Sequence, residues 1–500
     1  MDELLIGEVF ANAAAAVPDR VAAVHGSERL TYGELDRRGT ALAQELRRRG
    51  VGLGDRVVVW AETGLVQVPV FVALALLGAV YAPVSALLGI DEAARTIEHI
   101  RPALVLVDAA RAADGGALGD RVGAPAIGLA DLALTDRDPA DGAPVDVGLG
   151  PSPGPGERDP HVVFFTSGST GRAKGVVLSH RVSWLRSHPG ALLEPRGVAI
   201  CPYPMFHMAA WTQALQQWHA RGTVVFTTGD AGEICRAIDR HGASRINAIP
   251  AVWRRIAAFA ASPEGAVLDL TSVRFADTGT SATPPDLLAS IRATVPNAAV
   301  RVFYGSTETG AATMLADADI DRKPGSAGAV APFTAIRIAE DGELQVRGPQ
   351  VFERYDGDPE ATAAAFTADG WYRTGDLARQ DGEGYVTIVG RLGNVIRTGG
   401  EAVVPDEVEA VLQEHPAVAD VAAVGIPDAA WGEVVCAVVV PAAGAAPTVD
   451  ELAAHCDGRL ARFKRPRRVV VVEEIPRTAS TGQVQRRLIV DRLTGSAGPQ

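Results

Sequence analysis

The residues with the clearest chemical meaning lie in residues 166–175, TSGSTGRAKG, which hold four hydroxyls, three glycines and a lysine. Glycines let the backbone curl so that several N–H groups point into one concavity, as in loops that hold phosphate. The hydroxyls add donors, and Lys174 adds a positive charge. An apolar run, residues 161–165, precedes the stretch and is typical of a strand. The pattern predicts a phosphate-binding loop made of Thr166, Ser167, Gly168, Ser169, Thr170, Gly171 and Lys174.

This loop differs from the Walker A loop of P-loop NTPases. That motif needs glycine directly before its lysine and serine or threonine directly after it. Ala173 and Gly175 take those places here, so we do not expect a P-loop NTPase. The alternative interpretation, a flexible Gly/Ser turn without a ligand, explains neither the lysine nor the preceding strand.

A second stretch with chemical potential is residues 303–310, FYGSTETG, which begins at the end of a predicted strand. The Glu308 carboxylate lies among hydroxyls, and beside a triphosphate such a carboxylate could bind Mg²⁺. The alternative interpretation is an ordinary turn at the end of a strand. The order of this stretch relative to the others favours the metal site.

Two later stretches could complete a nucleotide site. In residues 371–377, WYRTGDL, Asp376 lies at a predicted turn and could accept hydrogen bonds from ribose hydroxyls. Residues 390–401 combine a basic residue, a flexible pivot and a glycine pair, which are Arg391, Gly393, Gly399 and Gly400.

The elements that must position these residues predict an α/β fold. Strand patterns at residues 56–61 and 81–84 alternate with helix patterns at 33–49 and 69–78. Such alternation favours parallel sheets covered by helices.

The pattern changes in the last third of the chain. After residue 325 it becomes rich in short strands, with the hairpin signal Asp341-Gly342. A compact α+β section follows, including a helix predicted for residues 449–462. We expect a large N-terminal domain of stacked α/β subdomains plus a β-rich subdomain, and a small mobile α+β C-terminal domain. The predicted boundaries are 1–390 for the first, 391–393 for a hinge and 394–500 for the second.

Bulk composition limits the classes of protein. The chain has 500 residues, of which 47% are hydrophobic and 21% charged, as in folded proteins with more than one domain. A net charge of -13 argues against a nucleic-acid or anionic-membrane surface. The four cysteines form no CxxC pair, so neither a disulfide frame nor a metal cage is expected. Residues 65–80 are too short for a membrane span, and no signal peptide is visible, so we expect a cytoplasmic protein.

Taken in order, the stretches resemble the adenylate-forming superfamily of acyl-CoA synthetases, peptide-synthetase adenylation domains and luciferases. The resemblance covers nearly the whole chain. It includes LTYGEL at residues 30–35, PMFH at 204–207 and VRGP at 346–349.

The resemblance implies a two-step reaction. A carboxylate attacks the α-phosphate of Mg-ATP to give an acyl-adenylate and pyrophosphate, and the thiol of coenzyme A then displaces AMP. It implies that the small domain rotates between the two steps, so that one site serves both.

The resemblance also implies a role for each matching residue. Thr166, Ser167, Ser169, Thr170 and Lys174 would hold the β- and γ-phosphates, Thr307 would touch the α-phosphate, and Glu308 would bind magnesium. Asp376 and Arg391 would bind the ribose, Tyr304 would lie along the adenine and acyl pocket, and Gly399 and Gly400 would line the pantetheine tunnel. His207 resembles the gate between the acyl and thiol channels, and its alternative interpretation is a packed core histidine.

The sequence departs from the family pattern at three places, which are Gln483, Gly393 and Arg397, the last standing where the family commonly has a lysine after the hinge. One further stretch, a polar turn, is also unusual. Gln483 stands where the family has a lysine that reaches the carboxylate and the α-phosphate, and this segment is one residue longer than usual. Loss of such a charged donor costs roughly 10²–10³ in rate, which would slow adenylation without abolishing it. Gly393 replaces the usual aspartate or lysine of the hinge, which makes the rotation less defined. The polar turn at residues 277–282 favours a small or polar acid over a long fatty acid.

Three hypotheses follow. The first is an ATP-dependent acid–thiol ligase that makes an acyl-CoA. The second is an atypical adenylating enzyme that activates another oxyacid, such as nitrite for diazotisation of an aryl amine, or passes the adenylate to an amine or a separate carrier protein. The third is a nucleotide-binding protein without catalysis. A monomer and a homodimer are both compatible with the sequence.

Overall fold

The computed structural model describes residues 3–132, 154–167, 173–188, 197–279, 281, 283–398, 401–429, 431–478 and 482–495. The chain splits into two compact units. The first unit contains Met1–Pro324, Val330–Ala335 and Arg347–Tyr372, and the second contains Gly325–Ala329, Ile336–Val346 and Arg373–Gln500.

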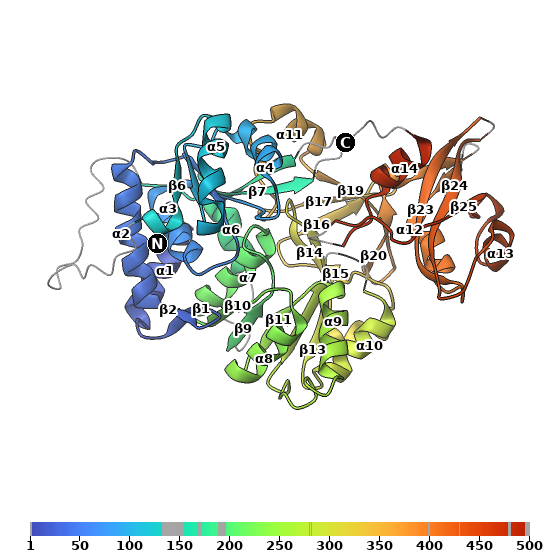
Figure 1. Cartoon of the computed structure of the whole chain (residues 1–500), viewed down its shortest axis with the longest axis horizontal. Coiled ribbons are helices and arrows are strands. Elements are labelled where there is room, and N and C mark those ends of the chain that lie inside the picture. Colours follow the sequence, from blue (N-terminus) through green and yellow to red (C-terminus); the bar gives the residue numbers. More distant parts are fainter. Residues whose placement is uncertain are drawn as a thin grey trace. The chain divides into compact units, whose positions relative to one another are not determined.

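The first unit contains a mixed sheet, of which β6 and β7 are labelled in Figure 1, and its strands β7 and β8 flank the predicted phosphate loop. Its central strands are parallel, and β7 and β8 form an antiparallel pair at one side. The central strands are almost entirely apolar and buried, as expected for parallel strands covered on both faces. In spatial order the strands are β18 (Arg354–Tyr355), β8 (Ala173–Ser179), β7 (Pro160–Ser167), β4 (Val80–Val84), β3 (Arg56–Trp60), β5 (Leu104–Val107) and β6 (Ala126–Gly128).

A second, larger sheet, which belongs to the same unit except for Ala329, carries the predicted magnesium and acyl-pocket residues. Parallel pairing runs from β13 to β1, with antiparallel strands at both sides. In spatial order the strands are β15 (Ala329–Val330), β14 (Gly310–Leu315), β13 (Ala299–Ser306), β12 (Phe275–Gly279), β11 (Arg245–Asn247), β9 (Val198–Cys201), β10 (Thr223–Phe226), β1 (Val21–His25) and β2 (Glu28–Thr31).

Helices between and beside these sheets bury the core of the first unit. Phe71 of α3 stacks on Trp211 of α7, with ring centroids 4.1 Å apart. A local signal marks the start of α2, where Thr31 and Glu34 form a capping box. The helices are α1 (Ile6–Ala16), α2 (Tyr32–Arg48), α3 (Gln67–Leu77), α4 (Ile90–Ile97), α5 (Ala112–Val122), α6 (His180–Ser187), α7 (Met208–His219), α8 (Ala231–His241), α9 (Pro250–Ala260), α10 (Pro285–Thr294) and α11 (Pro359–Ala365).

The second unit contains two sheets and three named helices among its described residues. One sheet has the order β16 (Ala335–Ile338), β17 (Glu343–Arg347), β19 (Tyr372–Gln380) and β20 (Val386–Arg391). The other has the order β22 (Glu401–Val403), β21 (Ile396–Thr398), β24 (Gly432–Pro441) and β23 (Val418–Asp428), and β25 (Arg468–Val471) pairs with β24. The helices are α12 (Pro405–Leu412), α13 (Val449–His455) and α14 (Arg486–Thr494).

The predicted fold class is confirmed, with two refinements. The helix expected over residues 449–462 ends at His455, because the chain turns and Gly458 takes a left-handed φ of 73°. Compact packing groups Gly325–Ala329 and Ile336–Val346 of the β-rich section with Arg373–Gln500, and the predicted hinge lies inside that unit as the short 3-10 turn Leu392–Asn394. The boundary at 391–393 stays a prediction.

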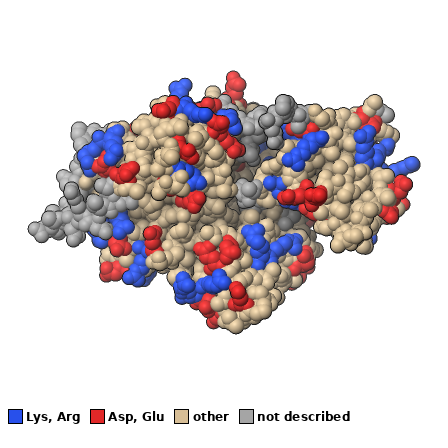
Figure 2. Space-filling view, viewed as in Figure 1, with Lys and Arg blue, Asp and Glu red and all other residues tan. Residues whose placement is uncertain are grey.

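Acidic and basic side chains are interspersed on the visible face of the described residues (Figure 2). Among the described helices, none is both long and apolar enough to cross a bilayer.

Candidate active site

The two ends of the predicted phosphate loop meet as neighbours in the sheet. Strands β7 and β8 pair antiparallel with Thr166 opposite Lys174 and Ser167 opposite Ala173. Gly168, Ser169, Thr170 and Gly171 lie outside the described residues, as does the side chain of Ser167. The described flanks therefore place Thr166 and Lys174 side by side at the mouth of the loop.

Tyr355 links Lys174 to Glu308. The Nζ atom of Lys174 lies 4.6 Å from the centroid of the Tyr355 ring, within the range of a cation–π contact. The Tyr355 hydroxyl donates a hydrogen bond to Oε1 of Glu308 over 3.1 Å. The phosphate-loop lysine and the predicted magnesium ligand are thus brought to one place by a residue that the sequence analysis did not single out.

Backbone hydrogen bonds hold this arrangement in position. The N–H of Phe352 donates to the carbonyl oxygen of Glu308, and the N–H of Asp356 donates to that of Gly175. Between them, β18 pairs with β8 so that Tyr355 lies opposite Val176. One short segment is therefore bonded both to the strand that carries Lys174 and to the turn that carries Glu308.

Burial keeps Tyr355 a hydrogen-bond donor. Its side chain is 5% exposed and packs against the ring of Phe352, with centroids 4.8 Å apart. Burial, reinforced by the nearby Glu308 carboxylate, raises the pKa of Tyr355 above its usual range. A tyrosine hydroxyl is protonated at neutral pH, and the raised pKa extends its role as a donor to Glu308 to alkaline pH.

The surroundings of Glu308 fit a magnesium ion that is shared with a nucleotide. Glu308 is 8% exposed, and one of its oxygens accepts from Tyr355. Among the described residues, no cluster of three or more His, Cys, Asp or Glu could enclose a metal. Mg²⁺ typically uses one or two carboxylates together with phosphates and water rather than a full protein cage, so a lone carboxylate beside a phosphate loop suits it.

His207 lies directly before α7 and is held neutral. Burial lowers its pKa to about 4. Its ring contacts that of Phe206, with centroids 4.3 Å apart, and its Nε2 has no hydrogen-bond partner within the described part of the chain. A neutral ring with a spare polar nitrogen is compatible with the predicted gate, and equally with the packed alternative.

The turn expected to line the acyl pocket has one buried and one exposed hydroxyl among its described residues. Thr278 is 1% exposed, and its hydroxyl is buried without a hydrogen-bond partner among the described residues. Ser281 is exposed, whereas Thr280 and Ala282 lie outside the described residues. Nearby in the sheet, the Tyr203 hydroxyl at the end of β9 donates to Asn247 Oδ1 at the end of β11, over 3.0 Å.

The second unit brings together the two predicted ribose residues. Asp376 on β19 pairs with Arg391 on β20, and Nε of Arg391 lies 2.8 Å from Oδ1 of Asp376. The Asp376 side chain is 9% exposed and that of Arg391 is 57% exposed, so the guanidinium remains accessible.

Comparison with known proteins shows the family of this chain. The model of the family described as AMP-binding enzyme matches residues 10–356, and that of the AMP-binding enzyme C-terminal domain matches residues 407–481. The chain belongs to the AMP-binding enzyme family.

Relatives of this AMP-binding enzyme extend over almost its full length. A feruloyl-CoA synthase from Amycolatopsis sp is 35% identical over 493 residues, covering 94% of this chain and 96% of the relative. The structure of ATP-bound MatB from Rhodopseudomonas palustris has a TM-score of 0.83 at 28% identity, covering 97% of this chain and 98% of MatB. The structure of MenE from Bacillus subtilis, in complex with ATP and magnesium, has a TM-score of 0.82 at 25% identity, covering 96% and 98%. The resemblance to the adenylate-forming superfamily is thereby confirmed.

In this AMP-binding enzyme, the backbone of Gln483 is hydrogen-bonded to Thr478 and its side chain is exposed. Its N–H donates to the Thr478 hydroxyl over 3.1 Å, and its carbonyl accepts from the Thr478 N–H over 2.8 Å. Residues 479–481 of this segment lie outside the described residues. Nearby, Arg486 forms ion pairs with Asp406 and Glu409, which occupies its guanidinium within the second unit.

Of the remaining predicted residues, the structure describes Tyr304 and Thr307 but not Gly399 and Gly400. Tyr304 lies on β13, opposite Thr313, and Thr307 immediately precedes Glu308. Gly399 and Gly400 lie outside the described residues. Their roles at a bound nucleotide or thiol stay predictions.

Proposed function

We propose that the protein activates a carboxylic acid with ATP as an acyl-adenylate and transfers the acyl group to coenzyme A. The observation that carries the proposal is the convergence of Lys174 and Glu308 on Tyr355, next to a hydroxyl- and glycine-rich loop. Family membership and the feruloyl-CoA synthase relative support the same reaction class.

Each described residue has a physical task in this reaction. The Lys174 ammonium would neutralise charge on the β- and γ-phosphates, and Thr166 would add a hydroxyl donor. Asp376 would accept from the ribose hydroxyls, with Arg391 fixing its carboxylate. A magnesium ion held by Glu308 would shield the phosphate oxygens from the approaching carboxylate.

We propose a small or polar acid as the substrate. The Thr278 hydroxyl, which has no partner among the described residues, and the Tyr203–Asn247 pair lie near the ends of β12, β9 and β11. Strand order reverses between β9 and β11, and ligands of open α/β sheets bind in the crevice at such a switch point. Polar groups at this crevice favour the binding of a substrate that can form hydrogen bonds with them.

Gln483 favours a second candidate, an enzyme that activates another oxyacid or uses another acceptor. A glutamine brings no positive charge to the α-phosphate, so adenylation of ordinary carboxylates would be slow. The second candidate therefore includes nitrite with an aryl amine as co-substrate, or an amine or carrier protein as acceptor.

Pyrophosphate release separates these possibilities. The wild-type protein would be assayed with ATP, magnesium and a panel of carboxylic acids, with and without coenzyme A, and with nitrite plus an aryl amine. Acid-dependent pyrophosphate and a new thioester support the ligase. Pyrophosphate released only with nitrite and the amine supports the second candidate. No release with any acid would contradict both.

A further inference from the structure

Arg186 is a buried cation behind the Thr307–Glu308 turn. It lies on α6 and is 9% exposed. Each of its guanidinium nitrogens donates to a backbone carbonyl oxygen. Nη1 donates to the carbonyl oxygen of Thr307, Nη2 to that of Glu308 and Nε to that of Gln350, each over 2.8 Å.

The surroundings of Arg186 keep its guanidinium charged and leave room for its close approach to the backbone at Gly310. Burial lowers the pKa of its guanidinium to about 9, with Glu308 opposing the effect, so the group stays charged at neutral pH. Gly310 has a left-handed φ of 65°, and a Cβ there would lie 3.0 Å from Nε of Arg186. Glycine thus serves both the backbone turn and the close approach of the guanidinium.

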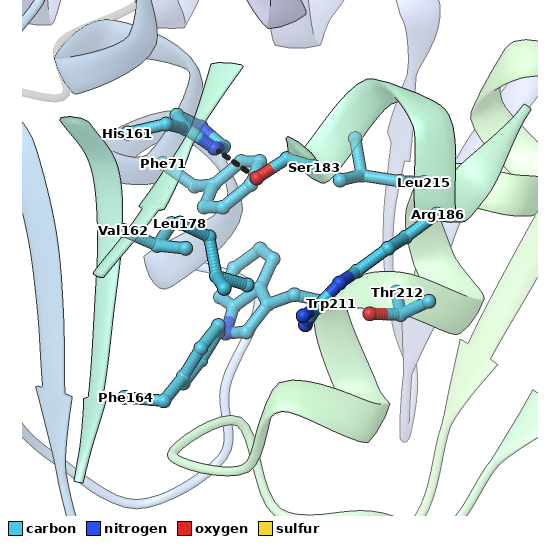
Figure 3. A pocket seen from close by; sticks show the side chains of 10 residues that line it. All are labelled: Phe71, His161, Val162, Phe164, Leu178, Ser183, Arg186, Trp211, Thr212 and Leu215. Atoms are coloured by element: carbon cyan, nitrogen blue, oxygen red, sulfur yellow. Dashed lines mark hydrogen bonds between the residues drawn. The ribbon is translucent and has the colours of Figure 1, made fainter. Parts of the chain in front are cut away.

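A small cavity borders the Arg186 side chain (Figure 3). Its volume is about 10 Å³, close to the space needed by one water molecule and far below that of a substrate pocket. Ser183, Thr212 and His161 also line the cavity. Nδ1 of His161 lies 3.0 Å from the Ser183 hydroxyl oxygen. The cavity therefore belongs to the support behind the site rather than to the site itself.

We propose that Arg186 is a positioning residue that fixes the Glu308 carboxylate for magnesium, by holding the Thr307, Glu308 and Gln350 carbonyls. This inference rests on the proposed function. Gln350 begins the segment that continues through Phe352 to Tyr355, so one guanidinium fixes both the backbone of Glu308 and the segment that supplies its hydroxyl donor. No motif in the sequence indicates this role of Arg186, because a lone arginine on a helix is usually a solvated residue.

The test is metal affinity measured apart from catalysis. Arg186→Lys and Arg186→Met would be compared with Arg181→Lys, a control on the same helix whose arginine pairs with Glu157 over 2.9 Å. Electron paramagnetic resonance would follow Mn²⁺ binding in the presence of ATP, calorimetry would follow ATP binding without metal, and thermal melting would report folding.

A positioning role predicts a selective loss. Arg186→Met should weaken Mn²⁺ binding by about tenfold or more and Arg186→Lys by about threefold, while metal-free ATP binding changes less than about twofold. Arg181→Lys should match the wild type in both measurements. If Arg186→Met lacks a cooperative melting transition, the Mn²⁺ and metal-free ATP affinities of Arg186→Lys decide whether the inference holds.

Two results would overturn the inference. Folded Arg186 variants with wild-type Mn²⁺ affinity would show that Glu308 needs no such support. Equal losses of Mn²⁺ and metal-free ATP binding would show a merely structural role. A wild-type protein that binds no Mn²⁺ with ATP would instead overturn the proposed function, and this inference with it.

Discussion

Replacing Tyr355 with phenylalanine should weaken magnesium–nucleotide binding while leaving the fold intact. The change removes the hydroxyl that donates to Oε1 of Glu308 over 3.1 Å and keeps the ring beneath Lys174. A hydrogen bond to a charged group contributes about 1.5–3 kcal/mol, which corresponds to a roughly 10- to 100-fold loss of affinity. The high end applies here because Glu308 is only 8% exposed, so water replaces the lost donor poorly.

Tyr355→Leu separates the two contacts of this residue. It removes the ring as well, and with it the cation–π contact to Lys174, 4.6 Å from the centroid. Such contacts contribute about 0.5–2 kcal/mol, so a further loss of roughly 2- to 30-fold is expected.

Mn²⁺ titration with a non-hydrolysable ATP analogue measures both effects without knowledge of the acid. Tyr32→Phe is a matched control, since the buried Tyr32 hydroxyl donates to the Gly222 carbonyl over 2.6 Å, outside the proposed site. It should lower the melting temperature without changing Mn²⁺ affinity. Wild-type affinity in a folded Tyr355→Phe protein would refute the view that Tyr355 orients Glu308.

The other predictions concern three elements of the account. Gln483→Lys should accelerate carboxylate-dependent pyrophosphate release, by roughly 10²–10³ if the new ammonium reaches the α-phosphate. Lys174→Ala should raise the Michaelis constant for ATP, because the triphosphate loses its cationic partner. The pKa of His180 is lowered to about 4 by burial, below its ordinary 6.5, and its Nδ1 accepts from the Ile6 N–H. The stability that neutral His180 provides is present above pH 6.5 and lost as pH falls toward 4, by roughly 3 kcal/mol, and His180→Gln should reduce this acid sensitivity in denaturant unfolding.

Each of these predictions can fail in a distinct way. A flat or lower rate in Gln483→Lys across good substrates would contradict the interpretation of Gln483 as a missing lysine. Unchanged ATP kinetics in Lys174→Ala would remove the phosphate-loop assignment. An equal loss of stability between pH 7 and pH 4.5 in wild type and His180→Gln would show that other groups, such as the adjacent buried His161, control acid unfolding.

Residues in one local motif, or on two strands that follow each other in the chain, were predictable. The glycines, hydroxyls and Lys174 lie within ten residues after an apolar run, and together they predicted the loop whose flanks are β7 and β8. Asp376 and Arg391 were predicted to share a ligand, and the pairing of β19 with β20 brings them into an ion pair.

Residues that depend on long-range packing were not predictable. Tyr355 lies on a two-residue strand, too short to show any periodicity, and it reaches Glu308 only because β18 pairs with β8. Arg186 contacts segments more than a hundred positions away in the chain. The helix predicted over residues 449–462 was too long because Gly458 alone gave too weak a local stop signal.

The most direct test of the central claim is a crystal structure of the protein with Mn²⁺ and a non-hydrolysable ATP analogue, using anomalous scattering to locate the metal. The account predicts a metal peak at coordination distance from a Glu308 oxygen and from the triphosphate, with Lys174 on the β- or γ-phosphate. A nucleotide bound elsewhere, or a metal held without Glu308, would contradict it.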